Sequence, residues 1–169
     1  MVEKENFSEN KFNKDVKNVY EIYTDGASRG NPGDSGIGFL IKKNGKDFIK
    51  KSFYIGIVTN NFSEYFALIT AVCFLSEFLS GKEIINVYSD SLLLIKQLNN
   101  EYSVKNILLK KSKIFLDFFF KNKNVFFFHI PREKNKIADL LANKGIDEKI
   151  SLPSHMCDIF NKINSNNSN

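Results

Sequence analysis

The chain of 169 residues has no tryptophan, two cysteines and two histidines. Cys73 lies in an apolar run and Cys157 near the end, so the cysteines offer neither a disulfide framework nor the spacing of metal ligands. The first eighteen residues are polar with mixed charges and lack the apolar core of a signal peptide. We therefore expect a reducing, cytoplasmic setting.

A membrane-spanning run is also missing. The longest apolar stretch, "YFALITAVCFLSEFL", contains Glu77 and follows Glu64, which favours a buried helix and no membrane partner. A hydrophobic content of 43% indicates one globular domain with a core. The net charge of +5 is consistent with a polyanionic partner but is weak support on its own.

The apolar periodicity predicts the element order β-β-β-α-β-α-α-β-α, hence an α/β fold with a five-stranded mixed sheet and helices on both faces. Asn44-Gly45 predicts a hairpin between the second and third strands. We expect a flexible polar N-terminus over 1–18, a catalytic domain over 19–147 and a polar, frayed C-terminal tail over 148–169. The predicted strands are 19–25, 36–43, 47–55, "EIINVYSD" and "NVFFFHIP", and the last predicted helix is "NKIADLLANKGI", capped by Asn135.

Four acidic residues stand out in this pattern. Asp25 ends the first predicted strand in "YTDGASRGNPG", and Asp90 ends the fourth; taken singly, they read as a turn residue and a helix N-cap. Glu64 shares a helix face with apolar residues, and Asp139 lies in the first turns of the last helix. The alternative to a functional role is a solvated first turn for Glu64 and stabilisation by the helix N-terminus for Asp139.

Taken together, the four acids predict a metal site. Two leave neighbouring strand ends and two begin helices that pack beside those strands. Four carboxylates in one pocket repel each other unless divalent cations separate them, and oxygen ligands suit Mg²⁺ or Mn²⁺. Two such ions about 3.5–4 Å apart clamp the attacking water and the leaving oxygen of a phosphoryl displacement. The predicted chemistry is therefore phosphodiester hydrolysis.

The segments that carry these acids resemble the type I ribonucleases H. The matching motifs, in order between about Tyr20 and Ile146, are "YTDGASRGNPG", "TNNFSEYFAL", "VYSDSLLLI" and "PREKNKIADLLAN". The resemblance implies a ribonuclease H-like fold and hydrolysis of the RNA strand of an RNA/DNA hybrid, leaving 3′-hydroxyl and 5′-phosphate ends. It implies that two Mg²⁺ ions, or Mn²⁺ as a substitute, bind the catalytic residues Asp25, Glu64, Asp90 and Asp139.

The resemblance also implies contacts with the hybrid, and no obligate protein partner is inferred. Backbone that includes glycine can approach the minor groove closely, and 2′-hydroxyl contacts distinguish RNA from DNA. Simple helix capping is the alternative role for the three residues before the glutamate helix. The implied contact residues are Ser28, Gly30, Asn31, Thr59, Asn60 and Asn61.

The sequence departs from the family pattern at three places. The loop before Asp139 is a short "PREKN" without a Gly-His motif, so Arg132 or Glu133 is expected to fill that role in part, and His129 is interpreted as a strand residue. A "HxPRExNxxAD" ending also occurs in the broader family, which indicates a subgroup. The basic, tryptophan-containing handle is missing, and eighteen N-terminal residues are too few for a separate hybrid-binding domain. We therefore expect modest, salt-sensitive affinity.

Two other functions are compatible with the same fold. A non-catalytic nucleic-acid-binding module would be favoured by loss of a metal ligand, but all four acids are present. A proofreading exonuclease usually carries two acids two residues apart on the first strand, whereas the second position here is Ala27. Fold alone does not decide between these functions; the acids favour the hybrid-specific nuclease.

Overall fold

The computed structural model describes residues 17–165, so most of the predicted N-terminal segment 1–18 lies outside the described residues. The described chain forms one sheet with the strand order β3-β2-β1-β4-β5. β1, β2 and β3 are antiparallel neighbours, whereas β4 and β5 run parallel to β1, which confirms the predicted mixed sheet. The elements are β1 (Val19–Gly30), β2 (Gly33–Lys43), β3 (Lys46–Val58), α1 (Asn60–Ser76), β4 (Ile84–Ser89), α2 (Leu92–Leu98), α3 (Ile107–Phe120), β5 (Asn124–His129), the 3₁₀ turn η1 (Arg132–Lys134), α4 (Lys136–Glu148) and α5 (Ser154–Asn164).

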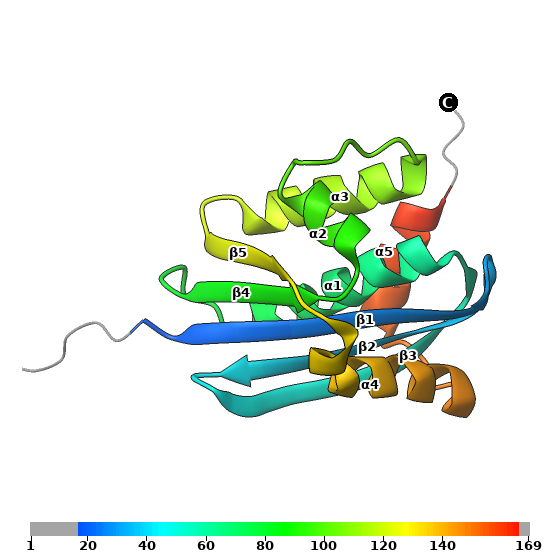
Figure 1. Cartoon of the computed structure of the whole chain (residues 1–169), viewed down its shortest axis with the longest axis horizontal. Helices are drawn as coiled ribbons and strands as arrows, with labels where there is room; N and C mark the ends of the chain where they lie inside the picture. Colours follow the sequence, from blue (N-terminus) through cyan, green and yellow to red (C-terminus); the bar gives the residue numbers. More distant parts are fainter. Residues whose placement is uncertain (1–16, 166–169) are drawn as a thin grey trace, which may run out of the picture.

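Helices cover both faces of the sheet, as the sequence predicts. α4 lies against β1, β2 and β3 on one face, while α1 lies against β1 and β2 on the other (Figure 1). α1 is apolar nearly all round, and it packs on the sheet with one side and on α3 with its outer side. Most of its residues from Phe62 to Leu75 are therefore buried. No helix within residues 17–165 is long and apolar enough to cross a membrane.

The first strand is longer than predicted. β1 continues past Asp25 to Gly30, and the turn to β2 contains the cis peptide bond between Asn31 and Pro32. The parallel pairing of β1 with β4 ends at Tyr23, whereas the antiparallel pairing with β2 continues and places Asp25 opposite Gly38. The sequence prediction of a strand end at Asp25 was therefore wrong. Asp25 lies instead where β1 loses one of its two neighbours.

Glycines on the two central strands let both helices approach the sheet backbone. A Cβ atom at Gly26 would lie 2.3 Å from the backbone nitrogen of Glu64 in α1. A Cβ atom at Gly38 would lie 2.3 Å from the backbone nitrogen of Ala142 in α4. Real side chains do not reach such distances, so only glycine permits this packing. The close approach brings the first turns of α1 and α4 to opposite sides of β1.

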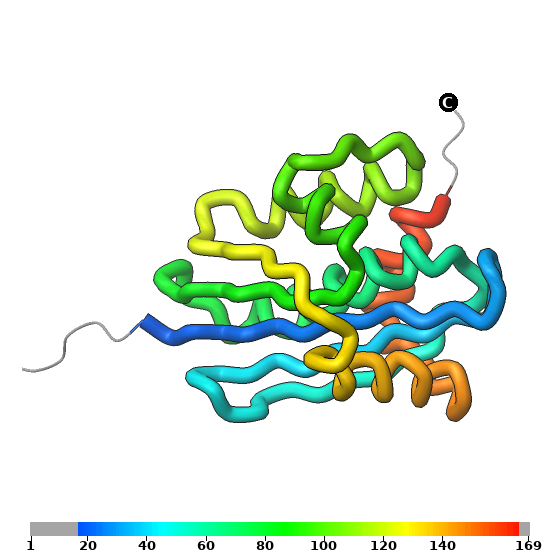
Figure 2. Tube along the Cα trace, viewed as in Figure 1, coloured from blue at the N-terminus to red at the C-terminus, as the bar shows by residue number. Residues whose placement is uncertain are grey.

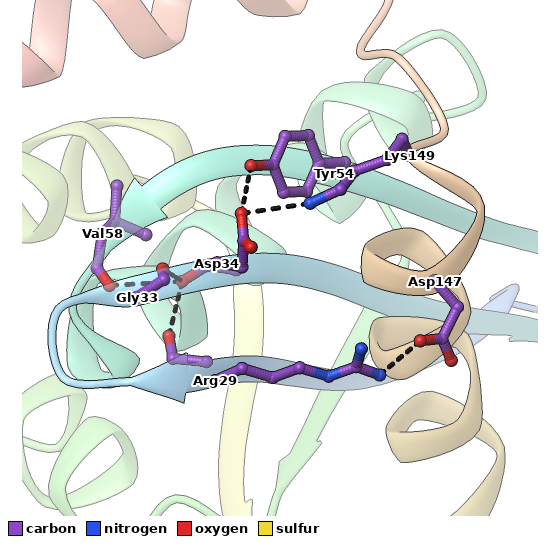
Figure 3. Close-up of polar contacts among 9 residues, drawn as sticks. Arg29, Gly33, Asp34, Tyr54, Val58, Asp147 and Lys149 are labelled. Carbon is purple, nitrogen blue, oxygen red and sulfur yellow. Dashed lines mark hydrogen bonds and ion pairs between the residues drawn. The ribbon is translucent and has the colours of Figure 1, made fainter.

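A polar cluster ties the C-terminal part of α4 to the β1–β2 hairpin (Figure 3). Arg29 of β1 forms an ion pair with Asp147 of α4. Asp34 of β2 accepts hydrogen bonds from the hydroxyl of Tyr54 and, at 3.0 Å, from the ammonium group of Lys149. Exposed ion pairs contribute little stability individually, so we interpret the cluster chiefly as fixing the position of α4 over the sheet.

The C-terminal region differs from the frayed tail that the sequence analysis expects. Residues 154–164 form α5, which contacts α3 (Figure 2). The ring of Phe160 packs edge-on against Phe62 and Phe66 of α1, and Met156 and Ile163 are buried. The expectation was wrong for this segment because three or four apolar residues at helical spacing suffice to bury one face of a short helix.

Candidate active site

The four predicted acids lie on four different elements around the centre of the sheet. Asp25 lies within β1, Glu64 in the first turns of α1, Asp90 directly after β4, and Asp139 in the first turn of α4. Asp25 is 5% exposed and Glu64 is 6% exposed. Asp90 is half-buried, and the Asp139 side chain is 29% exposed. The structure therefore brings together residues that are more than a hundred positions apart in the sequence.

Burial and mutual repulsion perturb the two inner acids. Burial, followed by the charges of Asp90 and Asp139, raises the pKa of Asp25 from 3.8 to about 7. Burial, followed by the charges of Asp25 and Asp90, raises the pKa of Glu64 well above its ordinary value. Water solvates a carboxylate better than a protein interior does, and a second negative charge adds to this penalty. A positive charge bound beside these two carboxylates would therefore be stabilised.

Only a few groups stabilise the charged form of these inner acids. The backbone N–H of Gly26 donates a hydrogen bond of 3.2 Å to Oε2 of Glu64. Arg132 in η1 donates to Oδ1 of Asp139 at 2.5 Å, and its charge also lowers the pKa values of Asp25 and Glu64. The Arg132 side chain remains 73% exposed. Arg132 therefore places a positive charge on the solvent side of the acids; its role in place of the loop histidine stays a prediction.

Asn135 links the acids to the sheet in a way that the sequence did not reveal. It is the N-cap residue of α4, as predicted, but its side chain makes no capping hydrogen bond. Its Nδ2 instead donates to the backbone oxygen of Thr24 at 2.9 Å and to Oδ1 of Asp90 at 2.6 Å. Asn135 is 1% exposed. It therefore fixes the orientation of Asp90 and joins α4 to β1.

Replacing Asn135 with Ala should lower both stability and activity. The change leaves buried acceptors without a donor, which costs about 1–3 kcal/mol of unfolding free energy, and it frees the Asp90 carboxylate. Chemical denaturation measures the stability, and kcat for the predicted cleavage of an RNA/DNA hybrid measures the activity. Asn106→Ala is the matched control, because Asn106 caps α3 far from the acids; it should cost about 1 kcal/mol and leave kcat unchanged. Equal kcat values in the two variants would contradict the positioning role.

The donor set fits hard divalent cations. It consists of carboxylate oxygens, and hard ions such as Mg²⁺ and Mn²⁺ prefer such ligands. Two buried side-chain atoms in the described chain have no hydrogen-bond partner. One is Oγ1 of Thr24, the residue before Asp25, and the other is Oδ1 of Asn135, whose Nδ2 donates to Asp90. Within residues 17–165 no three acidic, histidine or cysteine side chains already meet as ligands of one ion. Arg132 and Asn135 hold Asp139 and Asp90 in this arrangement.

The residues predicted to contact nucleic acid lie along one edge beside the acids. The turn after β1 and the start of α1 meet there, because the backbone N–H of Asn60 donates to Oδ1 of Asn31 at 3.1 Å. Thr59 caps α1 by accepting from the backbone N–H of Phe62, which is the capping alternative. Within the described chain the side-chain amides of Asn60 and Asn61 form no hydrogen bonds and are free for a ligand. Contact with a hybrid remains a prediction for all of these residues.

The remaining predicted residues lie at the rim. Ser28 shares a hydrogen bond with Ser35 at 2.6 Å, and Gly30 turns the chain with φ of 108°. Glu133 is exposed in η1. His129 ends β5, as predicted, but its Nε2 lies 3.3 Å from the backbone oxygen of Asp90. Its place at the end of a parallel strand beside Asp90 was the only sequence signal for this contact.

The strand order and the carboxylate group at the centre of the sheet define the ribonuclease H-like class of α/β proteins. Within that class, a model of the family described as RNase H matches residues 17–147. The chain therefore belongs to the ribonuclease H family, a family of nucleases.

Individual relatives agree with this assignment. Ribonuclease HI of Halobacterium salinarum is 35% identical over 130 residues, which cover 75% of this chain and 63% of that protein. Ribonuclease H of Methylobacillus flagellatus is 32% identical over 151 residues, covering 78% of this chain and 93% of that protein. The chain thus spans less than two thirds of the halobacterial relative.

A solved structure gives the same result. LC11-RNase H1, crystallised in complex with an RNA/DNA hybrid, superimposes with a TM-score of 0.72 and 40% identity, covering 76% of this chain and 97% of that chain. At this identity the likeness supports the family as well as the fold.

Proposed function

We propose that this chain is a metal-dependent endoribonuclease that hydrolyses the RNA strand of RNA/DNA hybrids and leaves 3′-hydroxyl and 5′-phosphate ends. The single observation that carries the proposal is the convergence of Asp25, Glu64, Asp90 and Asp139 at the centre of the sheet, where burial and the neighbouring acids raise the pKa values of Asp25 and Glu64. Membership of the ribonuclease H family and the hybrid-bound relative supply the substrate class.

The four acids would hold two Mg²⁺ ions, with Mn²⁺ as a substitute. When bound, the ions would activate a water molecule and stabilise the leaving oxygen of the phosphodiester. The chain's own residues prepare the acids for this. The N–H of Gly26 orients Glu64, and the amide of Asn135 orients Asp90. Positioning by such hydrogen bonds reduces the reorganisation that the reaction requires.

The edge formed by the β1–β2 turn and the start of α1 is where the hybrid is proposed to lie. Gly30 and Asn31 present exposed backbone there, and Asn60 and Asn61 offer amides that bond sugars or base edges. The exposed side chain of Arg132 lies beside Asp139, with which it forms an ion pair. In this arrangement Arg132 is placed to attract the phosphate backbone toward the acids.

Cleavage of a substrate panel tests the proposal. End-labelled RNA/DNA hybrid, duplex RNA and duplex DNA are incubated with the chain in Mg²⁺ or Mn²⁺, and the product ends are identified by their response to phosphatase and ligase. Cleavage of the RNA strand of the hybrid alone, with ligatable 5′-phosphate ends, is the expected result. Equal cleavage of duplex DNA would indicate another kind of nuclease. Binding without cleavage in either metal would favour a non-catalytic binding module.

A further inference from the structure

Three aromatic rings form a ladder across β1, β4 and β5. The ring centroids of Tyr23 and Tyr88 are 4.8 Å apart with the planes at 17°, and those of Tyr88 and Phe128 are 5.2 Å apart at 21°. Phe128 is 42% exposed, and its neighbour Phe126, on the same side of β5, is 52% exposed. We call Tyr23, Tyr88 and Phe128 the aromatic ladder.

The aromatic ladder lies on the α4 side of the sheet but is not covered by α4. Tyr23 lines a cavity with Ala138 of α4, which fixes the side. α4 packs against β1, β2 and β3, and in Figure 1 no helix of the described residues lies over β4 and β5 on this face. Intervening residues of the same strands, such as Val87 and Phe127, face the other side, where Phe127 packs on Phe120 of α3. The rings cover one another's faces, so the open part of the ladder is its end at Phe128, which lies on the edge strand β5 and is 42% exposed.

Lysines lie near the Tyr23 end of the ladder, where the Tyr23 hydroxyl also donates a hydrogen bond of 3.5 Å to Oε1 of Glu21. A cavity of about 160 Å³ lies between Tyr23 and the start of α4, and its lining includes Lys42, Lys134 and Lys136, with Glu133 as the one acid. The ammonium group of Lys42 is 5.6 Å from the centre of the Tyr23 ring. The open ring of Phe128 and the ammonium groups near Tyr23 match the two parts of a nucleotide, because bases stack on rings and phosphates attract ammonium groups.

The ladder is continuous with the candidate active site. Tyr23 precedes Asp25 by two positions, and Tyr88 precedes Asp90 by two positions. Alternate residues of a strand point to the same face, so the ring of Tyr23 and the carboxylate of Asp25 lie on one face of β1. A strand with one phosphate at the acids therefore reaches the ladder with its adjoining nucleotides.

We propose that the aromatic ladder binds unpaired nucleotides of the RNA strand where that strand extends beyond the hybrid. Only unpaired nucleotides expose base faces to the rings, because the bases of a duplex stack on each other. The RNA strand is favoured over the DNA strand because it is the strand that lies at the acids. This inference rests on the proposed function, and it predicts a preference for hybrids with single-stranded RNA tails.

The test compares KM values for hybrids of one duplex length. One hybrid is blunt, one has its RNA strand extended by a single-stranded tail, and one has its DNA strand extended by a single-stranded tail of equal length. Stacking on a ring contributes enough affinity that the RNA tail should lower KM about fivefold or more. In the Phe128→Ala variant, the RNA-tailed and blunt hybrids should have equal KM values, so the ratio of KM values is lost. Phe118→Ala is the matched control, because Phe118 is 79% exposed on α3, away from the ladder; it should keep the ratio.

Each outcome of this test has one meaning. Equal KM values for the blunt and RNA-tailed hybrids in the wild-type chain would overturn the inference, as would retention of the ratio in Phe128→Ala. An equal gain from the DNA tail would also overturn it, because the ladder would then receive the other strand. Failure of the wild-type chain to cleave any hybrid would instead contradict the proposed function. Thermal unfolding of both variants confirms that the exposed rings are not needed for folding.

Discussion

Glu64→Gln should reduce cleavage of the RNA strand at least about a thousandfold while making the metal-free protein harder to unfold. Glu64 is buried beside Asp25 and Asp90, and its carboxylate receives one backbone hydrogen bond, from Gly26. The amide of glutamine still accepts that bond but carries no charge. The substitution therefore removes a metal ligand and an electrostatic penalty together. Single-turnover cleavage and thermal unfolding in EDTA measure the two opposite changes.

Glu83→Gln is the matched control for this prediction. Glu83 is equally buried, but it accepts hydrogen bonds from the backbone N–H groups of Ser80 and Gly81 and from the Ser80 hydroxyl, and its pKa is lowered to about 2. Replacing this stabilised carboxylate should destabilise the fold by about 1–2 kcal/mol and leave cleavage unchanged. If both variants lost stability, or if Glu64→Gln kept its activity, Glu64 would be a structural residue.

The metal-free protein should become less stable as the pH rises from 4 to 8. The pKa of Asp25 is raised to about 7 in the folded state from 3.8, so between these values the folded state holds a proton that the unfolded state has lost. The free energy of unfolding therefore falls with rising pH through this window, by at most about 4 kcal/mol from Asp25, and levels off above pH 7. Mg²⁺ at pH 8 should restore stability, because it binds the ionised acids of the folded state.

Guanidinium unfolding in EDTA at pH 5 and pH 8 measures this effect. Asp25→Asn removes the titrating group and leaves the other ionisable residues in place, so the difference between wild type and variant isolates Asp25. The variant should show the smaller loss of stability on going to pH 8 and the smaller gain from Mg²⁺. An equal pH dependence in the two proteins would contradict the account of the buried Asp25 charge.

Much of the fold and the four acids could be predicted from the sequence. The element order followed from apolar periodicity, and the acids were recognisable because they interrupt segments that otherwise pack. Glu64 is the clearest case: its helix is buried nearly all round, so a carboxylate there needed a reason. Arg132 contacts Asp139, and the role of Arg132 or Glu133 in place of the loop histidine stays a prediction.

The features that were missed depend on contacts between distant segments. The length of β1 beyond Asp25 depends on continued pairing with β2, which the glycine-rich sequence conceals. Asn135 reads as a helix cap, and only the docking of α4 on β1 turns its amide toward Asp90. The aromatic ladder arises from single residues on three strands. Their alignment depends on the register of β1, β4 and β5, which no local pattern specifies.

Titration of Mn²⁺ into the chain at pH 8, followed by calorimetry, tests the central claim most directly. The claim is that the four acids converge in order to bind metal. The wild-type chain should bind Mn²⁺, and a variant with Asp25→Asn, Glu64→Gln, Asp90→Asn and Asp139→Asn should show no binding at the same concentrations while remaining folded by circular dichroism. Equal Mn²⁺ binding by the wild-type chain and the folded variant would contradict the claim.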